Sequence, residues 1–198
     1  MMSLTIAATL NAEKPFDFAT TPGKLPKQVV PEEYAIRIAP DLGKFTFAGS
    51  ETVKLKVQQP VRQLVLNALA INITSASLDG KAIPVSALKL DPKEETLTIT
   101  LASELPAGAH SLALDFTGKI NQQGQGLYYA PYREEAKVRE KGTSREEEAG
   151  TGAKKIMLGT QFEATDARRF FPCWDEPSFR ARFQLTAVVP ENFVAISN

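Results

Sequence analysis

The residue types that chemistry requires are concentrated in one stretch of this sequence, residues 160–177, which reads TQFEATDARRFFPCWDEP. The stretch combines carboxylates and two adjacent arginines with two prolines and the only Cys and only Trp of the chain. Polar groups packed this densely cost free energy unless a fixed arrangement satisfies each of them. The stretch is therefore the first place to look for a functional site.

Gln161 and Glu163 are the members of this stretch whose spacing suggests binding chemistry. In a strand, residues two apart point to the same side, so the two side chains would share a face, with Phe162 on the other. An amide oxygen beside a carboxylate can hold an ammonium group through one neutral and one charge-assisted hydrogen bond. The alternative, which the pattern alone favours, is a hydrogen-bonding ladder on the protein surface.

Other catalytic chemistries find little support in the residues. His110 and Cys173 are the single His and single Cys and lie far apart in sequence, so they cannot form a His/Cys zinc set. No nucleophile elbow accompanies His110, and the G-x-G fragment at residues 124–126 lacks the following helix of a phosphate site. Carboxylate pairs for sugar chemistry can be neither placed nor excluded. We expect no catalytic residue and no metal ligand set in this chain.

Around the candidate stretch, the hydrophobic pattern predicts strands and almost no helix. Apolar and polar residues alternate, most clearly over residues 47–57, and turn signals such as Asp79-Gly80 and Asp91-Pro92 separate the runs. The sequence predicts an all-β fold of antiparallel β-sandwich or saddle-like sheets, with few or no helices. The strands expected are residues 34–38, 47–57, 63–66, 71–78, 83–90, 96–101 and 111–116.

The chain divides into an arm and one domain. Residues 1–30 are rich in proline and weakly periodic, which predicts an extended N-terminal arm, and residues 31–198 form the β domain. Within that domain, residues 133–155 carry charges of both signs and almost no large apolar side chain, which is typical of a solvated loop insertion. The insertion separates two apolar runs, residues 127–129 and 156–158, so we interpret it as the tip of an extended hairpin.

Composition limits the classes of partner. The 198 residues carry 23 basic and 23 acidic side chains, so the formal net charge of zero argues against a nucleic acid or an anionic membrane. No apolar run is long enough to span a membrane. A single Cys forbids an intrachain disulfide and leaves the compartment open. The short apolar N-terminus gives only a slight preference for an exported or periplasmic protein over a cytoplasmic one.

Residues 160–177 closely resemble a signature of the zinc aminopeptidases of the aminopeptidase N type, the gluzincin aminopeptidases. Flanking segments are similar to that family too: residues 126–128 (Gly-Leu-Tyr), residues 31–38 around Tyr34, and residues 179–183 and 194–198. The resemblance covers about residues 30–198 and is to the N-terminal β domain that precedes the zinc-bearing catalytic domain.

The resemblance implies roles for individual residues. Gln161 and Glu163 fall where the family places the N-domain residues that help hold the free α-amino group of a peptide substrate. The charged residues Arg168, Arg169, Asp175 and Glu176 would form a network that fixes this strand and its turn. Aromatic residues of the stretch would pack the core or an interdomain face, and Cys173 would be a small buried hydrophobe.

The sequence departs from the family where catalysis resides. The H-E-x-x-H motif, the downstream Glu ligand and the G-x-M-E-N loop are absent, so the resemblance implies that zinc belongs to a catalytic domain missing from this chain. The chain alone should be inactive and hold no cofactor. Its partners would be the amino terminus of a peptide substrate, in the full-length parent, and the missing domain.

Two further expectations follow from this interpretation. Residues 194–198 would be a strand cut short, and the surface that faces the catalytic domain would be exposed and apolar, so the chain should self-associate through it.

The rival function is a non-catalytic β-sandwich that binds protein or peptide partners. Continuation of the coding sequence into H-E-x-x-H would distinguish the enzyme from that module.

Overall fold

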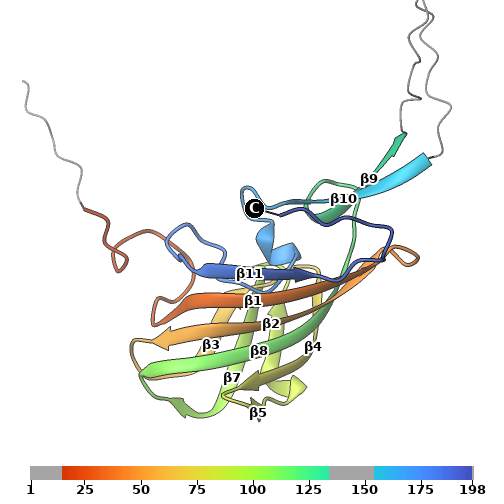
Figure 1. Ribbon diagram of the computed structural model, residues 1–198. Coiled ribbons are helices and arrows are strands. Elements are labelled where there is room, and N and C mark those ends of the chain that lie inside the picture. Colours follow the sequence, from red (N-terminus) through yellow and green to blue (C-terminus); the bar gives the residue numbers. More distant parts are fainter. Residues whose placement is uncertain (1–14, 134–153, 198) are drawn as a thin grey trace, which may run out of the picture.

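The computed structural model describes residues 15–133 and 154–197, and nearly all of the regular secondary structure in these ranges is β-strand (Figure 1). Two short 3-10 segments, η1 (Val85–Ala87) and η2 (Ala167–Arg169), are the only helical turns within these ranges. The predicted all-β class is confirmed. The strands are β1 (Val29–Asp41), β2 (Thr46–Val57), β3 (Val61–Asn67), β4 (Ile71–Leu78), β5 (Lys81–Ala82), β6 (Leu88–Asp91), β7 (Thr96–Leu105), β8 (Gly108–Lys119), β9 (Gly126–Arg133), β10 (Lys154–Gln161) and β11 (Arg182–Ala187).

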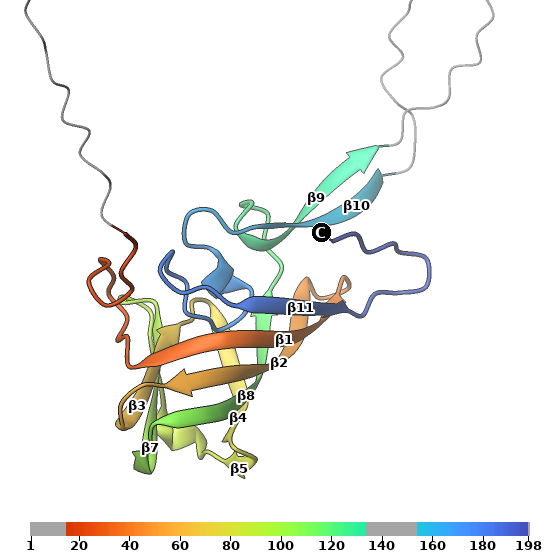
Figure 2. The ribbon, with the colours of Figure 1, turned by 60° about the vertical axis from the view of Figure 1, so that its left-hand side comes forward.

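The strands form three sheets. The largest has the order β11-β1-β2-β8-β4-β5, the second has the order β3-β7-β6, and β9 and β10 form a separate two-stranded sheet. All strand pairs within these sheets are antiparallel except β1 and β11, which run parallel at one edge of the largest sheet. Figure 2 shows the β9–β10 hairpin projecting away from the other two sheets, which pack together.

The two larger sheets enclose one hydrophobic core. Leu64 and Leu66 of β3 face inward, as do Leu112 and Leu114 of β8, and each is at most 1% exposed. Along β2, the valines and leucine between residues 53 and 57 are buried while the alternating Thr and Lys residues are exposed, as the period-2 pattern predicts. Residues 160–177, referred to below as the motif, join the same core through their aromatic residues and Cys173.

Strands β2 and β8 are matched by two reciprocal Phe–Gly pairs. Phe47 lies opposite Gly118, and Gly49 lies opposite Phe116. A Cβ atom on either glycine would approach the facing ring within 2.3 Å, so each ring lies directly on a backbone that only glycine provides. The two rings contact each other edge to face, with their centroids 6.5 Å apart.

Two predicted strands differ in the structure. Residues 83–90 do not form one strand, because Pro84 has no N–H to donate and is followed by η1, so that only β6 is extended. Residues 194–197 form no strand, and Val194 and Ile196 are 86% and 92% exposed; no neighbouring strand among the described residues pairs with them. Residue 198 lies outside the described residues.

The N-terminal segment that the structure describes folds back on the domain. Residues 15–28 contain turns and no strand, and β1 begins at Val29. Phe18 packs edge to face on Phe179, with ring centroids 5.3 Å apart. The apolar N-terminus on which the slight preference for export rests lies outside the described residues. No helix in residues 15–133 and 154–197 is long and apolar enough to cross a membrane.

The β9–β10 hairpin joins the two apolar runs that flank the charged segment. Lys154 pairs with Arg133 at one end, and Gln161 pairs with Gly126 at the other. The expected pairing of the two runs is therefore found. The predicted loop insertion, residues 133–155, falls mostly on residues 134–153, which lie outside the described residues.

Candidate functional site

The candidate site is the turn that follows β10. Gln161 is the last residue of β10, and Glu163 lies in the turn that leads to η2. The side-chain oxygen Oε1 of Gln161 accepts hydrogen bonds from the backbone N–H groups of Phe162 at 2.9 Å and Glu163 at 3.1 Å. The turn is closed by a hydrogen bond from the Asp166 N–H to the Phe162 carbonyl, and the Glu163–Ala164 peptide bond is cis.

The shared strand face predicted for Gln161 and Glu163 does not form. Strand geometry ends at Gln161, so the period-2 rule does not reach Glu163. The two residues are nevertheless neighbours, because the side chain of Gln161 holds the backbone of Glu163. Both side chains are exposed, and no described residue donates a hydrogen bond to the Glu163 carboxylate or pairs with it.

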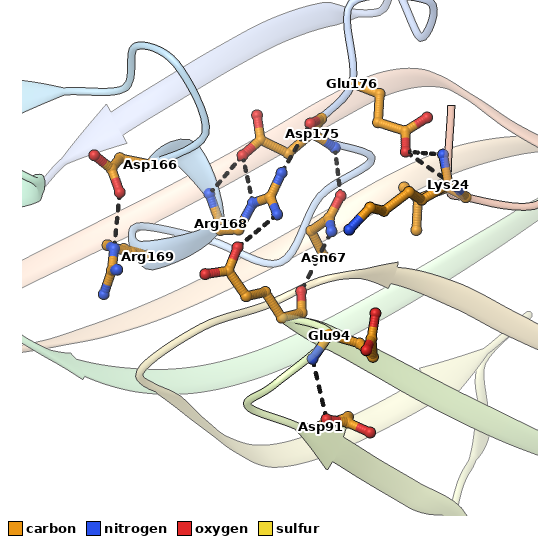
Figure 3. Close-up of polar contacts among 11 residues, drawn as sticks. Lys24, Asn67, Asp91, Glu94, Asp166, Arg168, Arg169, Asp175 and Glu176 are labelled. Carbon is orange, nitrogen blue, oxygen red and sulfur yellow. Dashed lines mark hydrogen bonds and ion pairs between the residues drawn. The ribbon is translucent and has the colours of Figure 1, made fainter. Parts of the chain in front are cut away.

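Arg168 is the centre of the polar network that supports this turn (Figure 3). Its guanidinium donates from Nε to Asp175 Oδ2 at 2.9 Å, from Nη2 to the Asp175 carbonyl at 3.0 Å, and from Nη1 to Glu95 Oε2 at 2.8 Å. The Arg168 side chain is only 9% exposed, and two carboxylates compensate its buried charge. Burial works against this charge, but the two ion pairs raise the pKa of Arg168 above its ordinary value.

Asn67, at the end of β3, fixes the other side of the network. Its backbone exchanges two hydrogen bonds with Cys173, at 2.7 and 2.9 Å. Its side-chain oxygen accepts from the Asp175 N–H at 3.1 Å, and its side-chain nitrogen donates to the Glu95 carbonyl at 3.3 Å. The motif is therefore fixed to the three-stranded sheet at two points, the end of β3 and the β6–β7 turn.

Arg169 anchors the turn to the hairpin. Arg169 Nε donates to Asp166 Oδ1 at 2.8 Å. Gly126, which pairs with Gln161, has a φ of 59°, and a Cβ there would come within 2.8 Å of the Arg169 side chain. Only glycine combines this backbone conformation with so close an approach. The base of β9, the end of β10 and η2 thus form one packed unit.

Glu176 connects the motif to the N-terminal segment. Its Oε1 accepts from the N–H groups of Lys24 at 2.6 Å and Leu25 at 2.9 Å. Its Oε2 lies so close to Gly23 that a Cβ there would be 2.2 Å away. Arg168 and Asp175 therefore bind each other, whereas Arg169 and Glu176 bind separate groups, so the four residues support the turn without forming one continuous network.

The aromatic residues and Cys173 form the apolar support of the motif. The Tyr34 hydroxyl accepts a hydrogen bond from the backbone N–H group of Trp174 at 3.2 Å, and the Tyr34 ring stacks on Phe183. Burial raises the pKa of the Cys173 thiol well above its ordinary value, and the nearby carboxylates of Asp175 and Glu51 raise it further. A thiol that resists ionisation is a poor nucleophile and a poor metal ligand.

Two network residues, Asn67 and Glu95, have no signal in the sequence that connects them to the motif. Asn67 ends the apolar run of β3, whereas Glu95 lies in the polar turn before β7 and adopts a φ of 55° that the residue type does not suggest. Only the folded chain brings them to Arg168. His110 lies apart from this network, with Nδ1 2.7 Å from Asp79 Oδ2 and Nε2 3.0 Å from the Pro106 carbonyl.

The part of the chain that the structure describes does not fit a zinc ion. No group of three or more His, Cys, Asp or Glu side chains converges in residues 15–133 and 154–197. The carboxylates of the motif are engaged by Arg168, Arg169 and backbone N–H groups, which leaves Glu163 as a single free ligand. A zinc site needs at least three protein ligands. Among the described residues, the turn therefore offers one free carboxylate, that of Glu163, and no set of zinc ligands.

Comparison of the sequence with known proteins identifies the family to which the chain belongs. The sequence profile of the peptidase M1 N-terminal domain matches residues 30–198. An aminopeptidase N from Acetobacter pasteurianus is 35% identical over 198 residues, which cover 100% of this chain and 51% of the relative. Aminopeptidase M1-D from Oryza sativa subsp. japonica is 38% identical over 175 residues, covering 88% of this chain and 18% of the relative. Aminopeptidase M1 from Arabidopsis thaliana is 36% identical over 181 residues, covering 88% and 19%.

These matches confirm the resemblance seen in residues 160–177 and its flanks. The chain spans about half the length of the bacterial relative and less than a fifth of each plant relative. It belongs to the peptidase M1 N-terminal domain family and corresponds to the N-terminal domain of M1 aminopeptidases.

Proposed function

We propose that this chain is the substrate-recognition part of a longer zinc aminopeptidase, in which Gln161 and Glu163 bind the free amino terminus of a peptide. The observation that carries the proposal is the free carboxylate of Glu163, held in a fixed turn within a domain of the M1 family. Zinc and the residues that activate water would belong to a catalytic domain outside this chain, since the described residues do not fit the metal.

The chemistry of the turn suits an ammonium group. The carboxylate of Glu163 is exposed and has no partner among the described residues, so no contact with another described residue has to break when a cation binds. A charge-assisted hydrogen bond between an ammonium and a carboxylate is about twice as strong as a neutral one. A peptide without a free amine would leave the carboxylate desolvated and unpaired, which would restrict cleavage to amino termini.

The names of the related proteins support an aminopeptidase over the rival function, a non-catalytic β-sandwich that binds protein or peptide partners. The bacterial and plant relatives described above are all called aminopeptidases. We therefore retain the aminopeptidase as the proposed function and a peptide amino terminus as the proposed ligand.

An apolar groove is the proposed contact with the catalytic domain. The groove has a volume of about 890 Å³ and lies between the hairpin, the end of β1, β11 and residues 189–197. Leu185, Met157 and Ile156 are among the side chains that line it, and the first two are 45% and 48% exposed. Exposed apolar surface of this kind usually marks an interface. In the isolated chain, a second copy would occupy the same face.

The direct test replaces Glu163 in the full-length protein. We expect Glu163→Ala to lower kcat/KM for free-amine aminoacyl anilides by about 10- to 100-fold, since a hydrogen bond to a charged group is lost. Zinc content should equal that of the wild type. Glu94→Ala, which removes an exposed carboxylate from the β6–β7 turn, is the matched control and should keep wild-type kinetics. Wild-type kcat/KM in Glu163→Ala would refute the role of this carboxylate.

A further inference from the structure

His110, the only histidine of the chain, presents both of its ring nitrogens to hydrogen-bond acceptors. It lies near the start of β8, and its side chain is 11% exposed. Nδ1 is 2.7 Å from Oδ2 of Asp79, in the turn between β4 and β5. Nε2 is 3.0 Å from the carbonyl oxygen of Pro106, in the turn between β7 and β8. The imidazole ring therefore connects two turns.

Both of these partners are acceptors without a proton to donate. A carbonyl oxygen only accepts hydrogen bonds, and an ionised carboxylate does the same. Burial works to raise the pKa of Asp79, but hydrogen bonds from His110 and from the backbone N–H of Ser111 keep it below its ordinary value. The Asp79 carboxylate is therefore ionised near neutral pH.

The protonation state of the ring decides how many of the two contacts are hydrogen bonds. An imidazolium ion has an N–H group on both nitrogens, whereas a neutral ring has one N–H group and one lone pair. The single proton of a neutral ring belongs on Nδ1, because a lone pair facing a carboxylate is less favourable than one facing an uncharged carbonyl. Nε2 and the Pro106 oxygen are then two acceptors 3.0 Å apart, and the contact is repulsive.

We propose that His110 is a proton-dependent clamp between the β4–β5 turn and the β7–β8 turn. The protonated ring binds Asp79 and Pro106 together, and loss of the proton from Nε2 releases the β7–β8 turn. Histidine loses its charge between about pH 5 and pH 8, so the contact with Pro106 is present at the acidic end of that range and is lost as pH rises.

The β4–β5 turn does not depend on the clamp, whereas the β7–β8 turn does. Asp79 exchanges two hydrogen bonds with Ser111 of β8, one through Oδ1 and one through its own N–H group, both at 2.8 Å. Strands β7 and β8 belong to different sheets, so no pairing between them holds the turn that connects them. Pro106 is exposed and has no N–H group to donate. Deprotonation should therefore loosen the connection between the two sheets.

Charged side chains on the neighbouring strands do not replace the partners of the ring. These side chains are Lys54 and Lys56 of β2, Arg62 of β3, Lys81 of β5 and Glu104 of β7. The two β2 lysines are exposed, whereas Leu55, which lies opposite His110, is buried. The Arg62 and Glu104 side chains form an ion pair at 4.0 Å. Lys81 acts on Asp79 and lowers the pKa of that carboxyl group further.

The clamp is independent of the proposed function. Figure 1 shows β5 at the end of the molecule away from the β9–β10 hairpin, and His110 makes its contacts outside the network around Arg168. The clamp would change the order of the domain with pH and would leave the turn that holds Glu163 in place.

Nuclear magnetic resonance of the single histidine tests the clamp directly. Because His110 is the only His of the 198 residues, a chain without a histidine tag gives one set of ring signals. Long-range proton–nitrogen spectra show which ring nitrogen carries a proton. We would record them at about pH 5 and about pH 8 and measure the backbone order parameter of Ala107 in the same samples.

Asp79→Asn changes the donor pattern and keeps the turn. Asn tolerates the left-handed conformation of residue 79, which has a φ of 51°, and its oxygen can still accept from the Ser111 N–H. Its NH2 group would face Nδ1 and donate to it, so a neutral ring would carry its proton on Nε2 and bind Pro106. The matched control is Asp91→Asn, because the Asp91 carboxylate also accepts from backbone N–H groups in its own turn.

Each form of the chain has a distinct expected result. At the higher pH, the wild-type ring should carry its proton on Nδ1, and the order parameter of Ala107 should be lower than at the acidic pH. Asp79→Asn should move the ring proton to Nε2 and keep Ala107 equally ordered at both pH values. Asp91→Asn should behave as the wild type does.

A neutral wild-type ring with its proton on Nε2 would overturn the clamp, and so would an equal order of Ala107 at the two pH values. Both results come from the wild type, so they decide the proposal even if a variant does not fold. If Asp91→Asn moves the ring proton as Asp79→Asn does, the Asp79 carboxylate does not hold that proton on Nδ1, and the assignment is wrong.

Discussion

Glu51 places a carboxyl group inside the hydrophobic core. It lies on β2 between Ile36 of β1 and Leu114 of β8 and is 3% exposed. Neither of its oxygens has a hydrogen-bond partner among the described residues. Burial raises the pKa of Glu51 well above its ordinary value, because the charged form would lose its hydration. Tyr34 and Cys173 are the titratable groups nearby on β1 and in the motif.

This burial predicts a pH-dependent stability. The pKa of Glu51 is higher in the folded than in the unfolded chain, so stability is fully present below the unfolded pKa and falls as pH rises toward the folded pKa. One such group changes the free energy of unfolding by up to about 1.4 kcal/mol per pH unit. We expect Glu51→Gln to flatten this slope above about pH 5, as measured by urea unfolding at several pH values.

The control for this prediction is Glu94→Gln, which changes an exposed carboxylate. It should keep the wild-type slope. Identical slopes in the wild type and Glu51→Gln would show that Glu51 does not ionise differently in the two states. The burial of Glu51 could not be predicted from the sequence alone. The period-2 alternation of β2, counted from Val53, places residue 51 on the buried face, whereas its charge suggests an exposed position.

The candidate site, too, could be predicted from the sequence only in part. Gln161 and Glu163 stood out in the sequence through their types and spacing, and the structure places both in one exposed turn. What the sequence could not supply is the end of the strand at Gln161, because strand ends are set by tertiary contacts such as the packing of Gly126 on Arg169. The orientation of the Gln161 amide follows only from that turn.

At the scale of elements, the Phe–Gly pairs fix the register of β2 against β8. A side chain on Gly118 would meet the Phe47 ring at 2.3 Å, and the ring is enclosed by the core. We expect Gly118→Ala to reduce the free energy of unfolding by about 1 to 3 kcal/mol, as overpacking usually does. Chemical denaturation measures this change.

Gly43 provides the matched control. It lies in the β1–β2 turn, and a Cβ there meets only the Asp41 side chain, at 3.3 Å. Gly43→Ala should therefore change stability much less than Gly118→Ala. Equal effects of the two substitutions would show that the ring contact does not determine the stability of this strand pair.

Strand prediction succeeded where the residues themselves dictate the pattern. The alternation in β2 and the apolar runs of β9 and β10 predicted elements that the structure contains. It failed at residues 83–90, where Pro84 interrupts the run, and at residues 194–197, which have apolar residues but no pairing strand in the described part of the chain. The parallel pairing of β11 with β1 involves segments about 150 residues apart, and local patterns carry no information about it.

At the scale of the molecule, the apolar groove predicts self-association of the isolated chain. Leu185 of β11 lines the groove, and Phe183 of the same strand is 61% exposed. We expect the sedimentation coefficient of the isolated chain to increase with concentration, since apolar surface of this extent favours burial. Leu185→Glu should abolish the increase.

Val85→Glu serves as the control for this prediction. Val85 is 63% exposed in η1, an apolar side chain of comparable exposure that does not line the groove. Its substitution should leave the concentration dependence unchanged. A monodisperse monomer of the wild-type chain at high concentration would contradict self-association through this face.

The central claim is that the chain recognises a substrate but does not carry the metal that cleaves it. The most direct measurement is the zinc content and the aminoacyl anilide turnover of the purified 198-residue chain after incubation with zinc and removal of excess metal. We predict substoichiometric zinc and no turnover above the uncatalysed rate, because the described residues offer no set of three ligands. One zinc per chain together with reproducible anilide cleavage would contradict the claim.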